Sequence, residues 1–139
     1  MPDQFDLQRF VDAQQAVYQQ VLAELRSGRK RSHWMWFIFP QIKGLGHTAT
    51  AQKFSISSLA EASAYLEHNL LGPRLRECSR LVAALEGCPI DGIFGYPDYL
   101  KFHSSMTLFA AATTDNQIFN DCLRKYFSGQ ADQSTMTRL

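Results

Sequence analysis

Cysteine is scarce in this sequence, and its few copies are too far apart to form a metal or disulfide motif. Cys78, Cys88 and Cys122 are the only three, and neither a CxxC pair nor a cysteine–histidine cluster with zinc spacing occurs. We therefore expect no metal site, no disulfide framework and no cofactor. This low cysteine content favours a reducing, cytoplasmic location.

An excess of one charge and a long apolar run are missing as well. With 14 basic and 13 acidic residues the net charge is +1, so nothing points to nucleic acid or an anionic membrane as a partner. No apolar run approaches the roughly 20 residues that a membrane span needs, and the polar start MPDQFDLQRF does not look like a signal peptide. The one dense basic run, RSGRKR at 26–31, is interpreted as a solvated helix end.

What remains is the composition of an ordinary folded domain. The chain has 139 residues, of which 45% are hydrophobic and 19% charged. A chain of this length and composition can bury a hydrophobic core without disulfides or metal ions. We expect a single helical domain over 1–139, with 130–139 as a polar, loosely docked tail. Nothing in the sequence specifies an oligomeric state.

Helical periodicity dominates the first half of the chain. Apolar residues at three- and four-residue steps from Leu7 to Leu25 predict one long helix that ends near Gly28. Ser32 can cap a short helix over 33–39 that Pro40 ends, although WFIF also suits a buried strand. Thr48 can cap a helix over 49–54.

The second half shows the same periodicity. Ser58 and Glu61 have the spacing of a capping box; further helices are predicted over 71–85 and 97–112, with 89–96 as a loop. Asp115 can cap a last helix that Gly129 ends. Because no alternating strand pattern is convincing, we predict an all-α, compact bundle of about six to seven helices, orthogonal rather than simply up-and-down.

The stretch SHWMWFIFPQIKGLG at 32–46 concentrates aromatic, polar and glycine residues. One interpretation is a core hub, because aromatic side chains bury the most area. The other is a pocket in which Trp34 or Trp36 stacks a flat ring, with His33 as a polar group or acid–base. The polar Gln41 and the glycines favour a segment that is core on one side and pocket wall on the other.

Two further groups of residues are candidates for chemistry. Backbone N–H groups of KGLGH, with Lys43, Gly44 and Gly46, can hold a phosphate, although a plain tight turn explains the glycines equally well. On the 97–112 helix, Asp98 and Lys101 are either a surface ion pair or an acid–base group with its counter-charge.

Polar residues at apolar positions add to these candidates. Gln14 interrupts the apolar face of the first helix, and a polar amide there needs a buried partner or a ligand. Ser104 and Ser105 lie between Phe102 and Phe109, where hydroxyls must bond back to the helix or bind something else.

Several segments resemble, in order, one family. They are FVDAQ (10–14), SHWMWFIFPQIKGLG, LGPRL (71–75), IFGYPD (93–98), LKFHSSMTLF (100–109) and GQADQST (129–135). The chain is similar to the bacterial family catalogued as domain of unknown function eighteen-ten. The resemblance implies a compact, mainly helical single domain and no established activity.

Two details qualify what the resemblance implies. Some members are labelled calpastatin, an inhibitor that is disordered until bound, whereas this aromatic-rich chain should fold alone. His103 stands where the family pattern has arginine, so a fixed positive charge is missing there. There is also a fainter likeness to small helical N-glycosidases of nucleotide and ADP-ribose metabolism.

Two hypotheses about function follow, and whether the protein is an enzyme is left open. The first is a nucleotide- or ADP-ribose-like small-molecule binding protein or a hydrolase of N-glycosidic bonds, with Asp98, His33 and Lys101 as catalytic residues. Its ligand-binding residues would be Gln14, Trp34, Trp36, Gln41, Lys43, Gly44, Gly46, Ser104 and Ser105. The alternative is a non-catalytic protein-interaction module, which predicts an exposed apolar patch larger than about 400 Å².

Overall fold

A computed structural model describes residues 3–139. Within that range it is a single domain with helices and no strand. The helices are α1 (Gln8–Gln15), α2 (Tyr18–Ser27), α3 (Met35–Ile38), α4 (Ala49–Lys53), α5 (Leu59–Glu67), α6 (Leu71–Ala84), α7 (Ile90–Phe94), α8 (Asp98–Ala112), α9 (Gln117–Phe127) and α10 (Gln133–Met136). The all-α prediction is confirmed, but six to seven helices was too few, because ten form in the part of the chain that is described.

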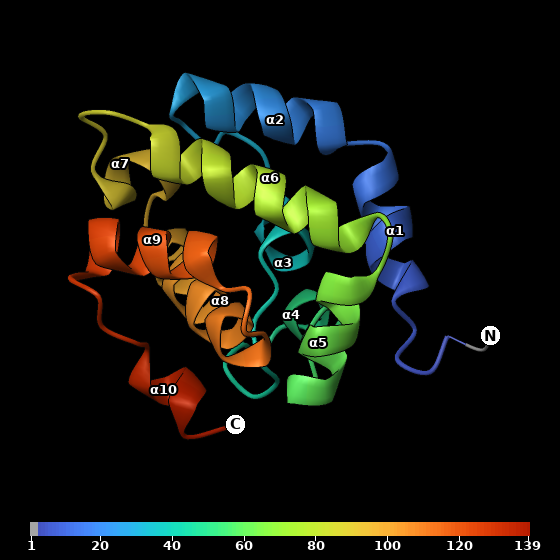
Figure 1. The fold of residues 1–139 in the computed structure, drawn as a ribbon. Helices are drawn as coiled ribbons and strands as arrows, with labels where there is room; N and C mark the ends of the chain where they lie inside the picture. The colour runs from blue at the N-terminus through green and yellow to red at the C-terminus, as the bar shows by residue number, and fades with distance from the viewer. Residues whose placement is uncertain (1–2) are drawn as a thin grey trace.

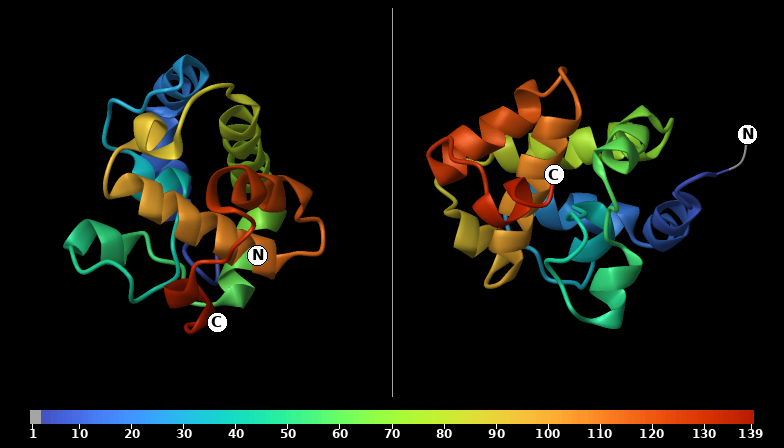
Figure 2. Two further views of the ribbon diagram at one scale, coloured as in Figure 1. Left: turned by 90° about the vertical axis from the view of Figure 1, so that its left-hand side faces the viewer. Right: turned by 90° about the horizontal axis from the view of Figure 1, so that it is seen from below.

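Helix α8 is the centre of the domain. It packs against α5, α7, α9 and α10, while α6 packs against α2, α5 and α9. Figure 1 shows α2 and α6 running side by side along one face, with α10 at the opposite end of the molecule, and the left view of Figure 2 shows α8 along the side that faces the viewer. Every side chain from Ser104 to Phe109 is buried, so the middle of α8 is covered around its whole circumference. That position explains why hydroxyls occur among its aromatic residues.

The predicted first helix is two helices. It breaks at Ala16 and Val17, where Val17 has φ −121°, outside the helical range. The bend allows α1 to pack on α3 while α2 packs on α6. Neither glycine nor proline marks the break, so the tertiary contacts decide it.

The segment 89–96, predicted as a loop, contains α7. Pro89 precedes the helix, and Ile93 and Phe94 are both buried. Their rings and methyl groups belong to the same core as Phe102, whose ring centroid lies 4.8 Å from that of Phe94. Burial of this short apolar face stabilises a helix that local propensity alone does not indicate.

Two of the predicted caps are confirmed and two are wrong. The Thr48 hydroxyl accepts a hydrogen bond of 3.1 Å, and the Ser58 hydroxyl one of 3.2 Å, each from the backbone N–H three residues later. Ser32 and Asp115 cap nothing, because α3 begins after Trp34 and α9 begins after Asn116.

The basic run 26–31 is more than a solvated helix end. Glu24, 3% exposed, accepts hydrogen bonds from the N–H groups of Arg31 and Ser32 at 2.6 and 3.0 Å, and from the Ser32 hydroxyl at 2.5 Å. The Lys30 ammonium lies 2.8 Å from Asp98 and is 8% exposed. The run therefore folds back over α2 and joins it to the start of α8.

No helix among residues 3–139 has the length and apolar character that would let it cross a membrane.

Candidate functional site

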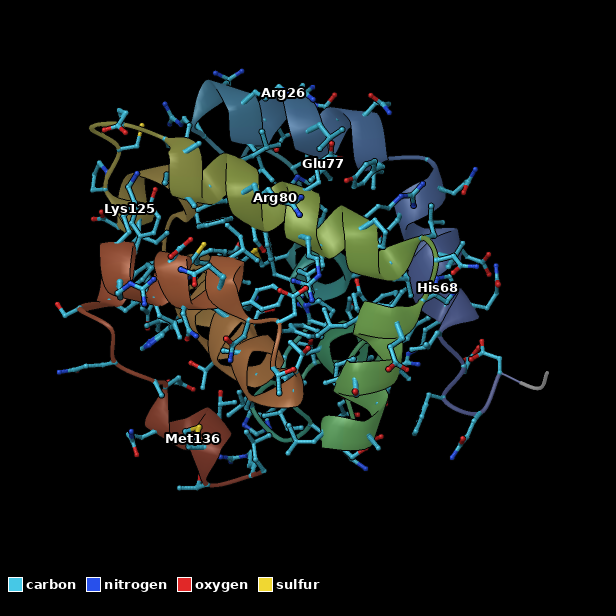
Figure 3. All side chains as sticks on the ribbon, in the orientation of Figure 1. Arg26, His68, Glu77, Arg80, Lys125 and Met136 are labelled. Carbon is cyan, nitrogen blue, oxygen red and sulfur yellow. The ribbon has the colours of Figure 1, made fainter. Side chains whose placement is uncertain are left out.

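A cavity of about 450 Å³ lies between three parts of the chain: the segment around α4, the start of α8 and the C-terminal segment. Its wall is apolar with a few polar groups. The lining residues are Trp36, Gln41, Leu45, Gly46, His47, Thr48, Ala51, Pro97, Leu100, Lys101, Ser104, Asp132 and Ser134. Figure 3 places Arg26, Glu77 and Arg80 on the α2–α6 face and Met136 on α10, at the far end of the molecule from them.

The loop that forms one wall of this cavity is held at its base. The Lys43 N–H donates to the Ile56 carbonyl, and the Ile56 N–H donates to the Gln41 carbonyl, both at 2.8 Å. These two bonds form an isolated parallel bridge between Ile42 and Ile56. Within the loop, a Cβ at Gly46 would lie 2.5 Å from the Ala51 Cβ. Glycine there lets the loop lie directly on α4.

Trp36 supplies the aromatic wall. Its indole is half-buried, and the Lys101 ammonium lies 5.1 Å from the centroid of its ring, which is close enough for a cation–π interaction. Lys101 also pairs with Asp98 at 3.2 Å, and Asp98 pairs with Lys30 at 2.8 Å. Two ammonium groups share one carboxylate, so this triad has a net positive charge beside the cavity.

Asp98 is therefore expected to matter for stability. Asp98→Asn should lower the free energy of unfolding by about 1–2 kcal/mol, because it leaves the buried Lys30 ammonium without a counter-charge. Urea denaturation at pH 7 measures the change. Asp121→Asn on α9, whose ion pair with Arg124 is exposed, is the matched control and should change stability by less than 0.5 kcal/mol. Equal effects of the two substitutions would contradict this assignment.

The C-terminal segment completes the cavity. The backbone N–H of Asp132 donates to the Thr107 hydroxyl at 2.9 Å, and the Ser104 hydroxyl donates to Asp132 Oδ2 at 3.2 Å. His103 Nε2 lies 2.8 Å from the Gln130 carbonyl oxygen. Residues 130–132 at the start of the polar C-terminal segment are thus joined to α8 by three hydrogen bonds.

A second cavity, of about 390 Å³, adjoins the first. Gly46 and His47 line both, and Lys43 and Gly44 line only the second of the two. Within residues 3–139, the backbone N–H groups of Gly44 and of residues 46–48 donate to no other group, whereas the Leu45 N–H closes the turn at 43–44. Arg138 also approaches this loop, since a Cβ at Gly44 would lie 2.9 Å from its Nε. The loop therefore combines free N–H donors with the basic side chains of Lys43 and Arg138.

The structure brings together eight of the twelve residues predicted for the site. Trp36, Gln41, Gly46, Lys101 and Ser104 line the main cavity. Lys43 and Gly44 line the adjoining one, and Asp98 lies behind Lys101.

The other predicted site residues lie elsewhere. Gln14 is 1% exposed, and its amide donates to the Phe37 carbonyl at 2.7 Å and to the Tyr65 hydroxyl at 3.1 Å. Trp34 is a core residue whose indole N–H donates to Glu24 at 3.0 Å.

His33 and Ser105 also lie outside the cavity lining. His33 is exposed and lines none of the cavities described here. Ser105 is fully buried inside α8 and is the only buried side-chain oxygen of the described residues without a hydrogen-bond partner.

Sequence reasoning missed Asp132, Ser134 and His47 as wall residues. Asp132 could have been recognised, because aspartate is a preferred N-cap residue. An N-cap side chain accepts a hydrogen bond from the backbone N–H up to three residues later, which here is that of Thr135. Its side chain accepts hydrogen bonds from the Thr135 N–H at 3.0 Å and from the Thr135 hydroxyl at 2.6 Å. A four-residue helix at the end of the chain is too short to stand out by periodicity.

The groups with raised pKa values lie in the core instead of the cavity. Burial raises the pKa of both the Cys78 and the Cys122 thiol to about 12, so neither is a nucleophilic thiolate at neutral pH. Burial also raises the pKa of Tyr18 and of Tyr65. No group of three or more histidine, cysteine, aspartate or glutamate side chains in residues 3–139 is arranged to hold a metal ion.

Comparison with known proteins agrees with the resemblance drawn from the motifs. The chain is similar to the conserved hypothetical protein Rv1873 from Mycobacterium tuberculosis, known from a crystal structure at 1.38 Å, with 58% identity and a TM-score of 0.98. The match covers 99% of this chain and 98% of the other. No protein with a curated description matches. The profile of one family, "Protein of unknown function (DUF1810)", matches residues 4–139, and the chain belongs to that family.

Proposed function

We propose that this protein binds a small nucleotide- or ADP-ribose-like molecule in the main cavity. The observation that carries the proposal is the wall itself: the half-buried indole of Trp36 lies beside the positively charged Lys101–Asp98–Lys30 triad, in a space of about 450 Å³. Small-molecule sites have this size and this mixture of apolar lining with a few polar groups. An aromatic ring packs against Trp36, and the excess positive charge suits a polarised or anionic ligand.

The adjoining cavity gives a phosphate group a place to bind. Lys43 supplies positive charge, and the free N–H groups of Gly44 and of residues 46–48 are donors from which phosphate oxygens accept hydrogen bonds. Gly46 and His47 border both cavities. A ligand whose ring lies in one cavity and whose phosphate lies in the other would cross the loop at these two residues.

The reaction that this ligand class suggests is hydrolysis of an N-glycosidic bond. A carboxylate would activate water or stabilise positive charge on the sugar. The sequence-based assignment of Asp98, His33 and Lys101 to catalysis stays a prediction. Of these three, Lys101 lines the cavity, Asp98 contacts Lys101, and His33 lies on the surface.

Tryptophan fluorescence tests the binding proposal. A ligand that stacks on Trp36 should quench its emission, whereas Trp34, buried in the core, should not respond. Titration with AMP, NAD, ADP-ribose and riboflavin-pathway intermediates should therefore give saturable quenching in the parent protein and none in Trp36→Phe. At 100 times its dissociation constant a ligand should add about 2.7 kcal/mol of stability, which raises the melting temperature by several degrees.

The absence of quenching and of a thermal shift across the whole panel would contradict the proposal. That result would favour the protein-interaction module. Quenching that persists in Trp36→Phe would show that a ligand binds elsewhere.

A further inference from the structure

The main cavity has a single carboxylate in its wall among the described residues, and it belongs to Asp132 rather than Asp98. Asp98 does not line the cavity, and each of its oxygens contacts an ammonium group: Oδ1 lies 3.2 Å from Lys101 and Oδ2 lies 2.8 Å from Lys30. Both of its oxygens are neutralised by ammonium groups. Asp98 therefore organises the cationic side of the cavity.

Only one of the two oxygens of the Asp132 carboxylate accepts hydrogen bonds within the protein. Oδ2 accepts hydrogen bonds from the Thr135 N–H, the Thr135 hydroxyl and the Ser104 hydroxyl, at 3.0, 2.6 and 3.2 Å. Within residues 3–139, Oδ1 accepts none of the hydrogen bonds formed. A carboxylate can accept about four hydrogen bonds in all, so Oδ1 keeps its accepting capacity in a residue that lines the cavity.

The position of this carboxylate is fixed from two directions. Its backbone N–H is bonded to Thr107 of α8, and its side chain caps α10. Ser104, which contacts it, lies three residues after Lys101 on α8, which is about 4.5 Å further along the helix axis. The carboxylate therefore contacts α8 about one helical turn after Lys101, and both residues line the same cavity.

We propose that Asp132 is the residue that selects the ligand, by accepting hydrogen bonds from a pair of sugar hydroxyls through Oδ1. The proposal rests on the proposed function and narrows it to ribose-containing molecules. The ring packs near Trp36 and Lys101, and the ribose hydroxyls meet the carboxylate, which contacts α8 about one helical turn after Lys101. Molecules without these hydroxyls leave the carboxylate without donors and bind more weakly.

The test compares ligands that differ only in these hydroxyls. AMP and 2′,3′-dideoxy-AMP, and UMP and its dideoxy counterpart, are titrated into the parent protein and into Asp132→Asn, Thr135→Val and Asp98→Asn, with Trp36 quenching as the signal. Asparagine keeps the cap on α10 with its oxygen but turns an N–H₂ donor toward the cavity. Thr135→Val loosens the same segment and leaves the carboxylate in place, which makes it the matched control.

The ratio of the two dissociation constants is the readout, since loosening of the tail would weaken both ligands alike. The parent and Thr135→Val should bind the ribose form at least about tenfold more tightly than the dideoxy form, and Asp132→Asn should lose that preference. A preference that survives in Asp132→Asn, or disappears only in Asp98→Asn, overturns this inference and leaves the proposed function standing. If no nucleotide quenches the parent protein, both are overturned.

Discussion

Replacing Glu24 by alanine should lower the free energy of unfolding by about 4 kcal/mol and the melting temperature by about 15 °C. The carboxylate is buried and accepts hydrogen bonds from two backbone N–H groups, from Ser32, from Gln20 and from the indole of Trp34. Alanine leaves the buried indole N–H without a partner and releases the 29–32 turn from α2. Urea and thermal denaturation measure the loss.

The matched control is Glu86→Ala, at an exposed glutamate, which should change stability by less than about 0.5 kcal/mol. An isosteric variant, Glu24→Gln, should lie between the two, since it keeps one acceptor oxygen but loses the charge. If Glu24→Ala were as stable as Glu86→Ala, the loop would not depend on this carboxylate.

The same residue predicts how stability depends on pH. Burial alone raises the pKa of Glu24, but hydrogen bonds from Ser32, the Arg31 N–H, Gln20 and Trp34 outweigh burial and lower the pKa to about 2, from an ordinary 4.5. Because the folded-state pKa is lowered, the ionised carboxylate contributes stability fully above about pH 4.5, up to about 3 kcal/mol, and this contribution is lost as the pH falls toward 2. Urea denaturation from pH 7 to 2 should show the parent approaching Glu24→Gln in stability through that window. A constant difference between them would contradict the assignment.

The second large effect is expected at the junction of α5 and α6. Gly72 is buried in the first turn of α6, and a Cβ there would lie 2.0 Å from the Leu66 carbonyl oxygen and 2.8 Å from the Leu66 carbonyl carbon. Both are backbone atoms, so the two helices would have to move apart. Gly72→Ala should therefore destabilise the domain by about 3 kcal/mol and lower the melting temperature by about 10 °C.

Gly92→Ala is the control for the intrinsic effect of the substitution. Gly92 also lies in a helix, α7, and its added Cβ would meet only the Pro89 ring, at 3.3 Å. Alanine favours helix over glycine by about 1 kcal/mol, so Gly92→Ala should change stability by about 1 kcal/mol or less. If Gly72→Ala had the same melting temperature as Gly92→Ala, α5 and α6 would be able to move apart at no cost in stability.

The parts of the fold that could be predicted are those that local sequence decides. Periodicity located α5, α6, α8 and α9, and Thr48 and Ser58 act as caps, because a helix face and a cap depend on residues within one or two turns. The break at Ala16 was not predictable in this way. It follows from α1 and α2 packing on different helices, which is a property of the assembled domain.

The candidate site likewise contains some residues that the sequence could predict and excludes others that it suggested. Trp36, Lys101 and Ser104 were expected in a pocket because aromatic and polar side chains alternate around them, and they line the cavity. Trp34 and Gln14 have equally suggestive patterns but find their partners in the core, at Glu24 and Tyr65. A sequence shows that a polar group needs a partner, whereas only the fold shows whether that partner is internal.

The bridge between Ile42 and Ile56 separates an exposed segment from the hydrophobic core. It closes the base of an excursion in which no side chain from 43 to 53 is buried, while both bridge residues belong to the core. Substitutions of the exposed side chains in the excursion, apart from those at Gly44 and Gly46, therefore alter one wall of both cavities at little cost to folding. The excursion could therefore be exchanged between related chains while the rest of the fold stays the same, and under the proposed function such an exchange would change which ligand binds.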